Sequence, residues 1–301
     1  MFEILLPQKS DAILFYFPYD GTMTLPLSSF TLSDADITKA LSQGFLVIPD
    51  VCPKDELTRL QDEYDQLFAE QRGKEEGLFF DLGGTDEDSK QRSLPQLLNP
   101  TKYMPWLTES QYMKNCESIT QQVLQKKEPA AFQSSHAILK PGKYGNTTPW
   151  HQDKSYWGYG SKRQKVNFRM PLEDATVEGG CLWYIPSSYG IEGQDGLDVL
   201  EHQPINNDPR IHGLELTQKG MGAVKIEEAV PAETPAGGVV IHFPYSLHYA
   251  GPNKTDIDRR AFIISCGYPE IPIHEEKRYP WQLRQKTLRM ERAEKNLSEK
   301  Q

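Results

Sequence analysis

The stretch GGVVIHFPYSLHYAGPNKTDIDRRAFIIS, residues 237–265, places two short apolar runs on either side of a Gly-Pro-Asn turn and a polar segment. The runs cover 238–243 and 261–267. Short apolar runs divided by Gly, Pro and Asn turns are typical of antiparallel sandwiches and barrels rather than of alternating βαβ units. The pattern begins at about residue 131, with further runs at 136–140, 165–172, 181–185 and 221–226.

The residues upstream of this pattern predict a hairpin, a helix and a strand. The first thirty residues alternate apolar and aromatic positions around Asp20-Gly21, which predicts a β-hairpin. Ser33 stands at an N-cap position with Asp36 at capping-box spacing, so we expect a short helix that ends near Gly44. The apolar run at 45–48 predicts a short strand.

Two amphipathic helices are expected before residue 131. One follows Pro53, and the other runs from Thr108 to Lys126. Between them, residues 71–100 are polar and rich in Gly, Asp and Gln, which predicts a long loop. The apolar faces of the two helices are formed by Leu57, Leu60, Tyr64, Leu67, Phe68, Met113, Cys116, Ile119 and Val123.

Composition narrows the class of protein. A chain of 301 residues can form one large domain or two ordinary ones, and 38% hydrophobic residues supply a core. The formal net charge of −9 argues against nucleic acid and anionic membranes as partners, but not against an anionic small molecule. Four scattered cysteines and the lack of a signal peptide or membrane-spanning segment predict a reduced, cytoplasmic protein.

The segment TPWHQDKSYWGYG, residues 148–160, carries the most informative motif. His151 and Asp153 are separated by one residue, so on a strand both side chains would project from the same face. An imidazole and a carboxylate form two thirds of a 2-His-1-carboxylate iron site, which leaves positions open for other ligands. Taken alone this spacing is weak, because a solvated strand or a structural ion pair would also produce it.

We expect the third metal ligand to come from the stretch at residues 237–265. His248 precedes the Gly-Pro-Asn turn, and Arg259 begins the next apolar run. Arg259 offers a planar fork that can bind a carboxylate with two hydrogen bonds. His242 is a rival third ligand, but it lies inside an apolar run, so a buried histidine in the core or beside a ligand is the simpler interpretation.

Together these residues resemble the phytanoyl-CoA dioxygenase family of iron(II)- and 2-oxoglutarate-dependent oxygenases. The family pattern is K-P-G, then W-H-x-D, D-A-T, G-C-L-x-x-I-P-x-S, and finally H-x-x-G-x-N with Arg. The match covers roughly residues 35–270, most densely from 133 to 266. The matching residues are Lys140-Pro141-Gly142, Trp150-His151-Gln152-Asp153, Asp174-Ala175-Thr176, Gly180-Cys181-Leu182, Ile185-Pro186, Ser188, His248, Gly251, Asn253 and Arg259.

The resemblance implies a mainly β fold with flanking helices, a double-stranded β-helix or jelly roll of the cupin kind. We therefore expect one oxygenase domain over residues 1–301. In it, the N-terminal hairpin and helices within 1–130 pack on a jelly-roll core at 131–270. A charged C-terminal helix is expected at 275–301.

The resemblance also implies site residues and cofactors. Iron(II) would be bound by His151, Asp153 and His248, with 2-oxoglutarate as co-substrate and dioxygen as oxidant. Arg259 matches the group that holds the distal carboxylate of 2-oxoglutarate. Ser134, His136 and Trp157 match positions at which relatives contact the co-substrate. Tyr156 and Arg169 are the residues that we expect to contact the substrate.

The implied reaction is hydroxylation of an unactivated C–H bond of a small molecule, with release of succinate and carbon dioxide. Desaturation, epimerisation and rearrangement need no different ligands and stay open. Asp153 argues against the halogenating relatives, which lack this carboxylate. The substrate is expected to be of the natural-product or secondary-metabolite type, and the oligomeric state is not predicted.

Three positions depart from the family pattern. Many relatives carry Ser or Thr two residues after the distal histidine, where its hydroxyl binds the co-substrate carboxylate, but this chain has Ala250. Position 169 is commonly Trp or another apolar residue and is Arg169 here, which either compensates for the missing hydroxyl or faces the substrate. Relatives often end the G-C-L segment with Gly-Ser-His, in place of Ser187-Ser188-Tyr189. Ala250 and Arg169 are the best support for one alternative, a catalytically silent jelly roll that binds a metal or small ligand, and the intact triad with Arg259 argues against it. Another alternative, a cupin that uses a different metal, leaves Arg259 unexplained.

Overall fold

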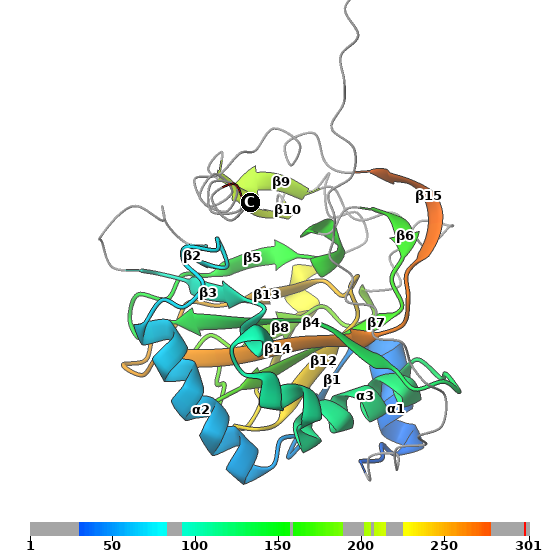
Figure 1. Ribbon diagram of the computed structural model, residues 1–301. Helices are drawn as coiled ribbons and strands as arrows, with labels where there is room; N and C mark the ends of the chain where they lie inside the picture. The colour runs from blue at the N-terminus through cyan, green and yellow to red at the C-terminus, as the bar shows by residue number, and fades with distance from the viewer. Residues whose placement is uncertain are drawn as a thin grey trace, which may run out of the picture.

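Two antiparallel sheets face one another, and three helices cover the outer side of the larger sheet (Figure 1). The computed structural model describes residues 30–82, 92–156, 159–188, 202–205, 208–214, 225–277 and 298. The hairpin expected in the first thirty residues and the side chain of Trp157 lie outside the described residues. The predicted mainly β, jelly-roll class is confirmed.

Counted over the described residues, the larger sheet has seven strands and the smaller one has four. In spatial order the larger sheet contains β1 (Phe45–Ile48), β12 (Val239–His242), β7 (Lys165–Pro171), β14 (Arg259–Gly267), β4 (Ala131–Lys140), β3 (Pro95–Leu98) and β2 (Phe79–Asp81). The smaller sheet contains β11 (Val230–Ala232), β8 (Leu182–Tyr184), β13 (His248–Ala250) and β5 (Thr148–His151). Two separate pairs are β9 (His202–Ile205) with β10 (Asp208–Leu214), and β6 (Tyr159–Lys162) with β15 (Ile271–Lys277).

The helices form where the sequence provides caps and apolar faces. The Ser33 hydroxyl accepts a hydrogen bond from the backbone N–H of Asp36, and the Asp36 carboxylate accepts one from the backbone N–H of Ser33. This capping box begins α1, and Gly44 ends it at φ +86°, a conformation that favours glycine. The α-helices are α1 (Asp34–Gln43), α2 (Lys54–Ala69) and α3 (Gln111–Val123); the 3₁₀ helices are η1 (Pro100–Lys102), η2 (Pro105–Glu109), η3 (Asp153–Tyr156) and η5 (Ile226–Glu228).

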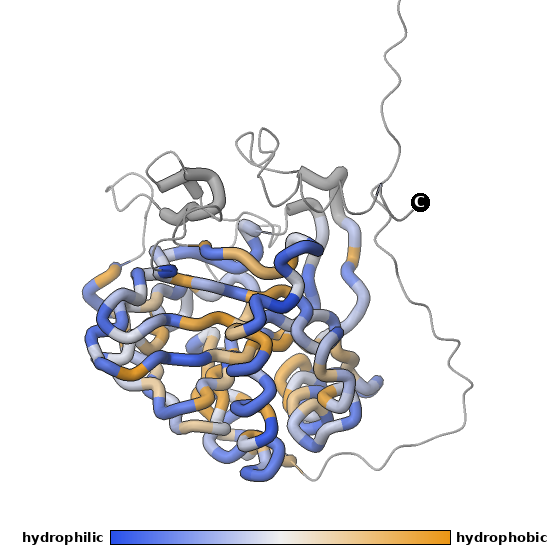
Figure 2. Tube along the Cα trace, turned by 60° about the vertical axis from the view of Figure 1, so that its left-hand side comes forward, coloured by the Kyte–Doolittle hydropathy of each residue, from blue (hydrophilic) through white to orange (hydrophobic). Residues whose placement is uncertain are grey.

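Alternation along the strands of the larger sheet divides its side chains between two faces. On β14, Phe262, Ile264 and Cys266 join the main hydrophobic core beneath the helices. Arg259 and Ser265 therefore point the other way, into the space between the sheets. Figure 2 shows hydrophobic residues gathered along the strands and on the helix sides that meet them. The polar residues of this inner face are therefore positioned to contact a ligand bound between the two sheets.

Several expected elements are corrected by the structure. The expected loop at 71–100 contains β2 and β3, which extend the larger sheet from β4. The second helix begins at Gln111, because Ser110 provides the N-cap and the preceding residues form η2. The run at 221–226 ends in η5 rather than in a strand, and 221–224 lie outside the described residues.

The C-terminal prediction is wrong where the structure describes it. Residues 275–277 belong to β15, which pairs with β6, so no helix begins at 275. Apart from Ser298, which is helical, the residues beyond 277 lie outside the described part of the chain. Among the described residues, no helix is long and apolar enough to cross a membrane.

Candidate active site

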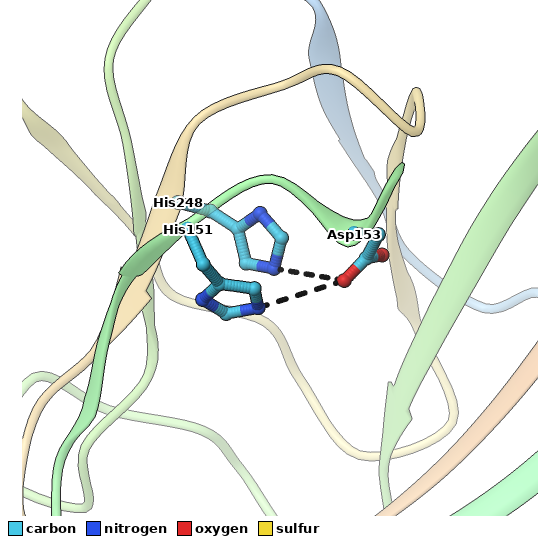
Figure 3. Close-up of side chains that lie close together, drawn as sticks. All are labelled: His151, Asp153 and His248. Atoms are coloured by element: carbon cyan, nitrogen blue, oxygen red, sulfur yellow. Dashed lines mark ion pairs between the residues drawn. The ribbon is translucent and has the colours of Figure 1, made fainter. Parts of the chain in front are cut away.

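His151, Asp153 and His248 converge at one end of the smaller sheet (Figure 3). His151 ends β5 and His248 begins β13, and the two histidines are cross-strand partners. The expectation that Asp153 shares a strand with His151 is wrong, because β5 ends at His151 and Asp153 opens η3. The 3₁₀ turn nevertheless returns the carboxylate to the imidazoles.

The three side chains have the arrangement of a metal site. The same carboxylate oxygen, Oδ1 of Asp153, lies 3.5 Å from His151 Nε2 and 3.6 Å from His248 Nε2. All three candidate ligand atoms lie within 4.8 Å of one another. A divalent ion with bonds of about 2.1 Å needs neighbouring ligand atoms about 3 Å apart, so a small contraction would close the site. Two imidazoles and one carboxylate suit iron(II) and leave further positions open.

Backbone carbonyls fix the tautomer of both histidines. His151 Nδ1 donates to the carbonyl of Pro149 at 2.7 Å, and His248 Nδ1 donates to the carbonyl of Ser246 at 2.9 Å. Each Nε2 therefore keeps a free lone pair directed towards Asp153. Burial and the neighbouring His151 hold the pKa of His248 well below its usual range, which favours the neutral, metal-binding imidazole.

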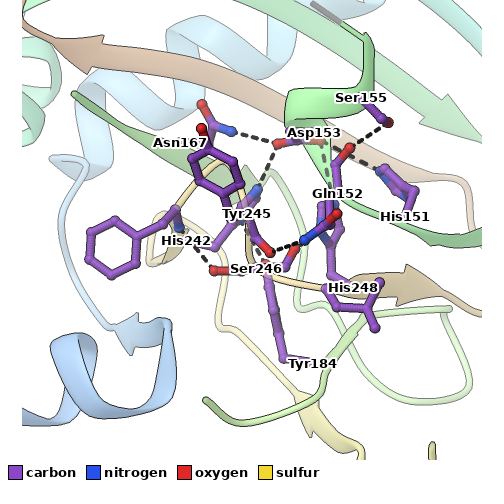
Figure 4. Close-up of polar contacts among 12 residues, drawn as sticks. His151, Gln152, Asp153, Ser155, Asn167, Tyr184, His242, Tyr245, Ser246 and His248 are labelled. Carbon is purple, nitrogen blue, oxygen red and sulfur yellow. Dashed lines mark hydrogen bonds and ion pairs between the residues drawn. The ribbon is translucent and has the colours of Figure 1, made fainter. Parts of the chain in front are cut away.

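The second oxygen of Asp153 is held by neighbours on the larger sheet (Figure 4). Oδ2 accepts hydrogen bonds from Asn167 Nδ2 and from His242 Nε2, the latter at 2.9 Å. Asn167 Oδ1 accepts in turn from the Ser265 hydroxyl at 2.6 Å. Burial would raise the pKa of Asp153, but the neighbouring histidines, including the hydrogen-bond donor His242, outweigh burial and hold that pKa well below its usual range.

His242 is a buried neighbour of a candidate ligand, in line with the simpler of its two interpretations. Its Nδ1 meets the hydroxyl of Tyr184 at 2.8 Å. Asn167 and Tyr184 were not singled out from the sequence. Asn167 is a polar residue within the apolar strand β7, which is a usable signal, whereas nothing local distinguishes Tyr184 from a packing aromatic.

The expected co-substrate residues lie on the inner face of the larger sheet. Arg259 is buried, and its Nε and Nη2 have no hydrogen-bond partner among the described residues. Ser134 and His136 alternate on β4, where they pair with Ser265 and Ile263 of β14. Burial lowers the pKa of His136 to about 4, so this histidine is neutral at physiological pH.

The two residues expected to contact substrate lie on different elements. Tyr156, in η3, packs edge-on against the His151 ring, with centroids 5.5 Å apart, and is 36% exposed. Arg169, in β7, faces the interior between the sheets. A cavity of about 600 Å³ is lined by Tyr64 and Arg260 on the helix side of the larger sheet, and no residue of the His-Asp-His group lines it.

A jelly roll that brings two histidines and one carboxylate together defines the class of cupin-like iron oxygenases. The family model described as phytanoyl-CoA dioxygenase (PhyH) matches residues 41–261. The chain belongs to this family. Its members use iron(II), 2-oxoglutarate and dioxygen, so the predicted cofactors are confirmed.

Similar proteins come from bacteria, plants and animals. EvdO2 from Micromonospora carbonacea var. aurantiaca is 32% identical, with 83% of this chain and 97% of that chain covered and a TM-score of 0.67; its 2-oxoglutarate complex gives 0.66. Phytanoyl-CoA dioxygenase domain-containing protein 1 of Danio rerio is 24% identical over 270 residues, covering 77% of this chain and 88% of the relative. Phytanoyl-CoA dioxygenase 1 of Oryza sativa subsp. japonica is 29% identical over 141 residues, and the alignment spans 47% of this chain and less than half, 46%, of the rice protein.

Proposed function

We propose that the chain hydroxylates an unactivated C–H bond of a small molecule in an iron(II)- and 2-oxoglutarate-dependent reaction that releases succinate and carbon dioxide. The observation that carries this proposal is the convergence of His151 Nε2, His248 Nε2 and one oxygen of Asp153. Membership of the phytanoyl-CoA dioxygenase family supports it. We expect the substrate to be of the natural-product or secondary-metabolite type.

The proposed metal ligands are His151, Asp153 and His248. When bound, iron supplies the activation of dioxygen, coupled to oxidative decarboxylation of 2-oxoglutarate. The carbonyls of Pro149 and Ser246 fix the ring orientation of the two imidazoles and keep each Nε2 available as a ligand atom. Only Oδ1 of Asp153 would be left to bind the metal, because Oδ2 accepts hydrogen bonds from Asn167 and His242.

We propose that Arg259 binds the distal carboxylate of 2-oxoglutarate. Its buried Nε and Nη2, which have no hydrogen-bond partner within the described ranges, would be costly to leave without an anion, and a carboxylate matches the guanidinium fork. Ser134 and the neutral His136 are proposed to contact the same co-substrate, since both line the inner face beside β14. Trp157 is proposed as a co-substrate contact on the resemblance alone.

Tyr156 is proposed to contact the primary substrate. Its ring is fixed against His151, yet it keeps 36% exposure, as expected for a residue between the metal and an incoming ligand. Hydroxylation requires that the target carbon lie beside the metal while bulk water is kept out. An aromatic side chain at this position can pack against the substrate to position the target carbon and can also exclude bulk water.

The test is an anaerobic titration of the metal-free protein with iron(II) and then 2-oxoglutarate, followed by visible absorption. We expect a weak charge-transfer band that is absent in His248→Ala. Screening by succinate release and mass spectrometry of products then distinguishes hydroxylation from desaturation or epimerisation. Iron binding without any band on addition of 2-oxoglutarate would contradict the proposal and favour a silent ligand-binding jelly roll.

A further inference from the structure

Arg169 is a cation inside the jelly roll. On β7, Val166, Phe168 and Met170 belong to the core beneath the helices, so Arg169 points between the sheets. Its side chain is only partly exposed. No hydrogen bond or ion pair joins it to another residue within the part of the chain that the structure describes. A shielded cation without a partner is unfavourable unless a ligand supplies the counter-charge.

The strand register places Arg169 between the metal site and Arg259. Asn167, whose amide donates to Asp153, marks the metal end of β7. Arg169 lies two residues further along, opposite Ile263 of β14. Arg259 lies another four residues along β14 in the same direction. Because two residues span about 7 Å of strand, a ligand reaching from the metal towards Arg259 passes Arg169.

The two guanidinium groups are close enough to affect one another. Burial, followed by the positive charge of Arg169, lowers the pKa of Arg259 to about 9. Lys140 is also buried nearby, but its amino group already donates to the carbonyls of Ala250 and Gly251. Asp153 attracts Arg169 electrostatically, but the oxygens of Asp153 are directed at the three histidines and Asn167 and make no hydrogen bond to either arginine. The inner face thus has a surplus of positive charge that an anionic ligand would balance.

Position 250, where many relatives have a serine or threonine hydroxyl, is an alanine in this chain. Ala250 is fully buried and packs with Leu182 and Tyr184 in an apolar cluster. A carboxylate bound between the sheets therefore lacks the hydrogen bond that a serine or threonine would give. Arg169 supplies donors on the opposite wall of the same interior.

We propose that Arg169 and Arg259 together bind the distal carboxylate of 2-oxoglutarate, with Arg169 supplying the hydrogen bonds that Ala250 lacks. The inference rests on the proposed function. Two guanidinium groups can bind the two carboxylate oxygens separately, which makes the distal carboxylate the main determinant of co-substrate affinity.

The experiment measures the anaerobic dissociation constants of two 2-oxo acids for the iron(II)-loaded protein and its Arg169→Leu variant. The ligands are 2-oxoglutarate and 2-oxovalerate, which keeps the metal-chelating group but lacks the distal carboxylate. Isothermal calorimetry and the charge-transfer band both report binding without turnover. We expect Arg169→Leu to weaken 2-oxoglutarate by about tenfold or more and 2-oxovalerate by less than about twofold.

Arg260→Leu is the matched control. Arg260 is adjacent to Arg259 but faces the helix side, where it pairs with Asp65 and Glu173. Its replacement removes the same charged group as Arg169→Leu, but on the helix side of the sheet. We therefore expect unchanged binding of both 2-oxo acids. The double variant Arg169→Trp with Ala250→Ser restores the residues common in relatives and is expected to regain affinity lost in Arg169→Trp alone.

Two results would overturn the inference. One is unchanged 2-oxoglutarate affinity in Arg169→Leu, with or without loss of binding of the primary substrate. The other is equal weakening of both 2-oxo acids, which would indicate a general distortion of the site. If the unaltered protein gives no charge-transfer band at all, the proposed function itself fails, which is a distinguishable result.

Discussion

His242 Nε2 lies 2.9 Å from Oδ2 of Asp153, the oxygen that the two candidate ligand histidines do not approach (Figure 4). His242 Nδ1 lies 2.8 Å from the hydroxyl of Tyr184. If the tyrosine hydroxyl donates to Nδ1, the proton of His242 is on Nε2 and is donated to the carboxylate. The two contacts therefore fix the orientation of Asp153 before any metal binds.

His242→Phe keeps a ring of similar size but removes the hydrogen bond to Asp153. We expect iron(II) affinity to fall about 10- to 100-fold, because the carboxylate loses a partner that holds its outer oxygen. Anaerobic competition with a chromophoric chelator measures the affinity. Tyr184→Phe, which leaves the contact between His242 and Asp153 in place, is expected to have a smaller effect. Iron binding as tight as in the unaltered protein would show that Asn167 alone positions the carboxylate.

Asp153→Ala removes the only carboxylate of the proposed iron site. Succinate release coupled to substrate oxidation should be abolished, since Asp153 is one of the three proposed iron ligands and alanine offers no ligand atom in its place. Differential scanning fluorimetry provides a readout that does not depend on activity. Iron(II) should raise the melting temperature of the unaltered protein, because it binds only the folded state, and should not raise that of the variant. Full activity in Asp153→Ala would refute the assignment.

The elements that were predicted correctly carry their signals locally. The capping box of Ser33 and Asp36 and the apolar spacing of α2 are contained within one or two helical turns. In contrast, β3 carries no alternation that would mark it as a strand and gains its hydrogen bonds from β4, which lies far along the chain. The stretch at 275–277 is likewise a strand because β6 pairs with it, despite its charged composition.

In the candidate site, too, the residues with a motif signal were predictable and those brought together by strand pairing were not. The triad was found because His248 and Arg259 have a motif spacing around His151 and Asp153. The turn at Asp153 was missed, because the HxD spacing carries no signal for the residue at which β5 ends. Side chains that hold Asp153 come from other strands, so only the sheet register brings them to it.

Ser33→Ala tests the capping box of α1. The variant loses the hydrogen bond to the Asp36 backbone N–H and the side-chain contact between the two residues. We expect the free energy of unfolding to fall by about 1 kcal/mol, the usual effect of losing an N-cap. Urea unfolding measures it. Ser42→Ala, which removes a hydroxyl bonded only within the same helix, is the control and should change stability much less.

Protonation of His136 should destabilise the fold in mild acid. Burial lowers its pKa to about 4 in the folded protein, below the ordinary value of about 6.5 that it regains on unfolding. Between these values the unfolded chain binds the extra proton, so this contribution to stability is present above pH ~6.5 and is lost as pH falls towards ~4. We expect the metal-free protein to lose about 1–2 kcal/mol more than His136→Gln between pH 7 and pH 5. Urea unfolding in the presence of a chelator measures both, and equal losses would mean that His136 keeps its ordinary pKa.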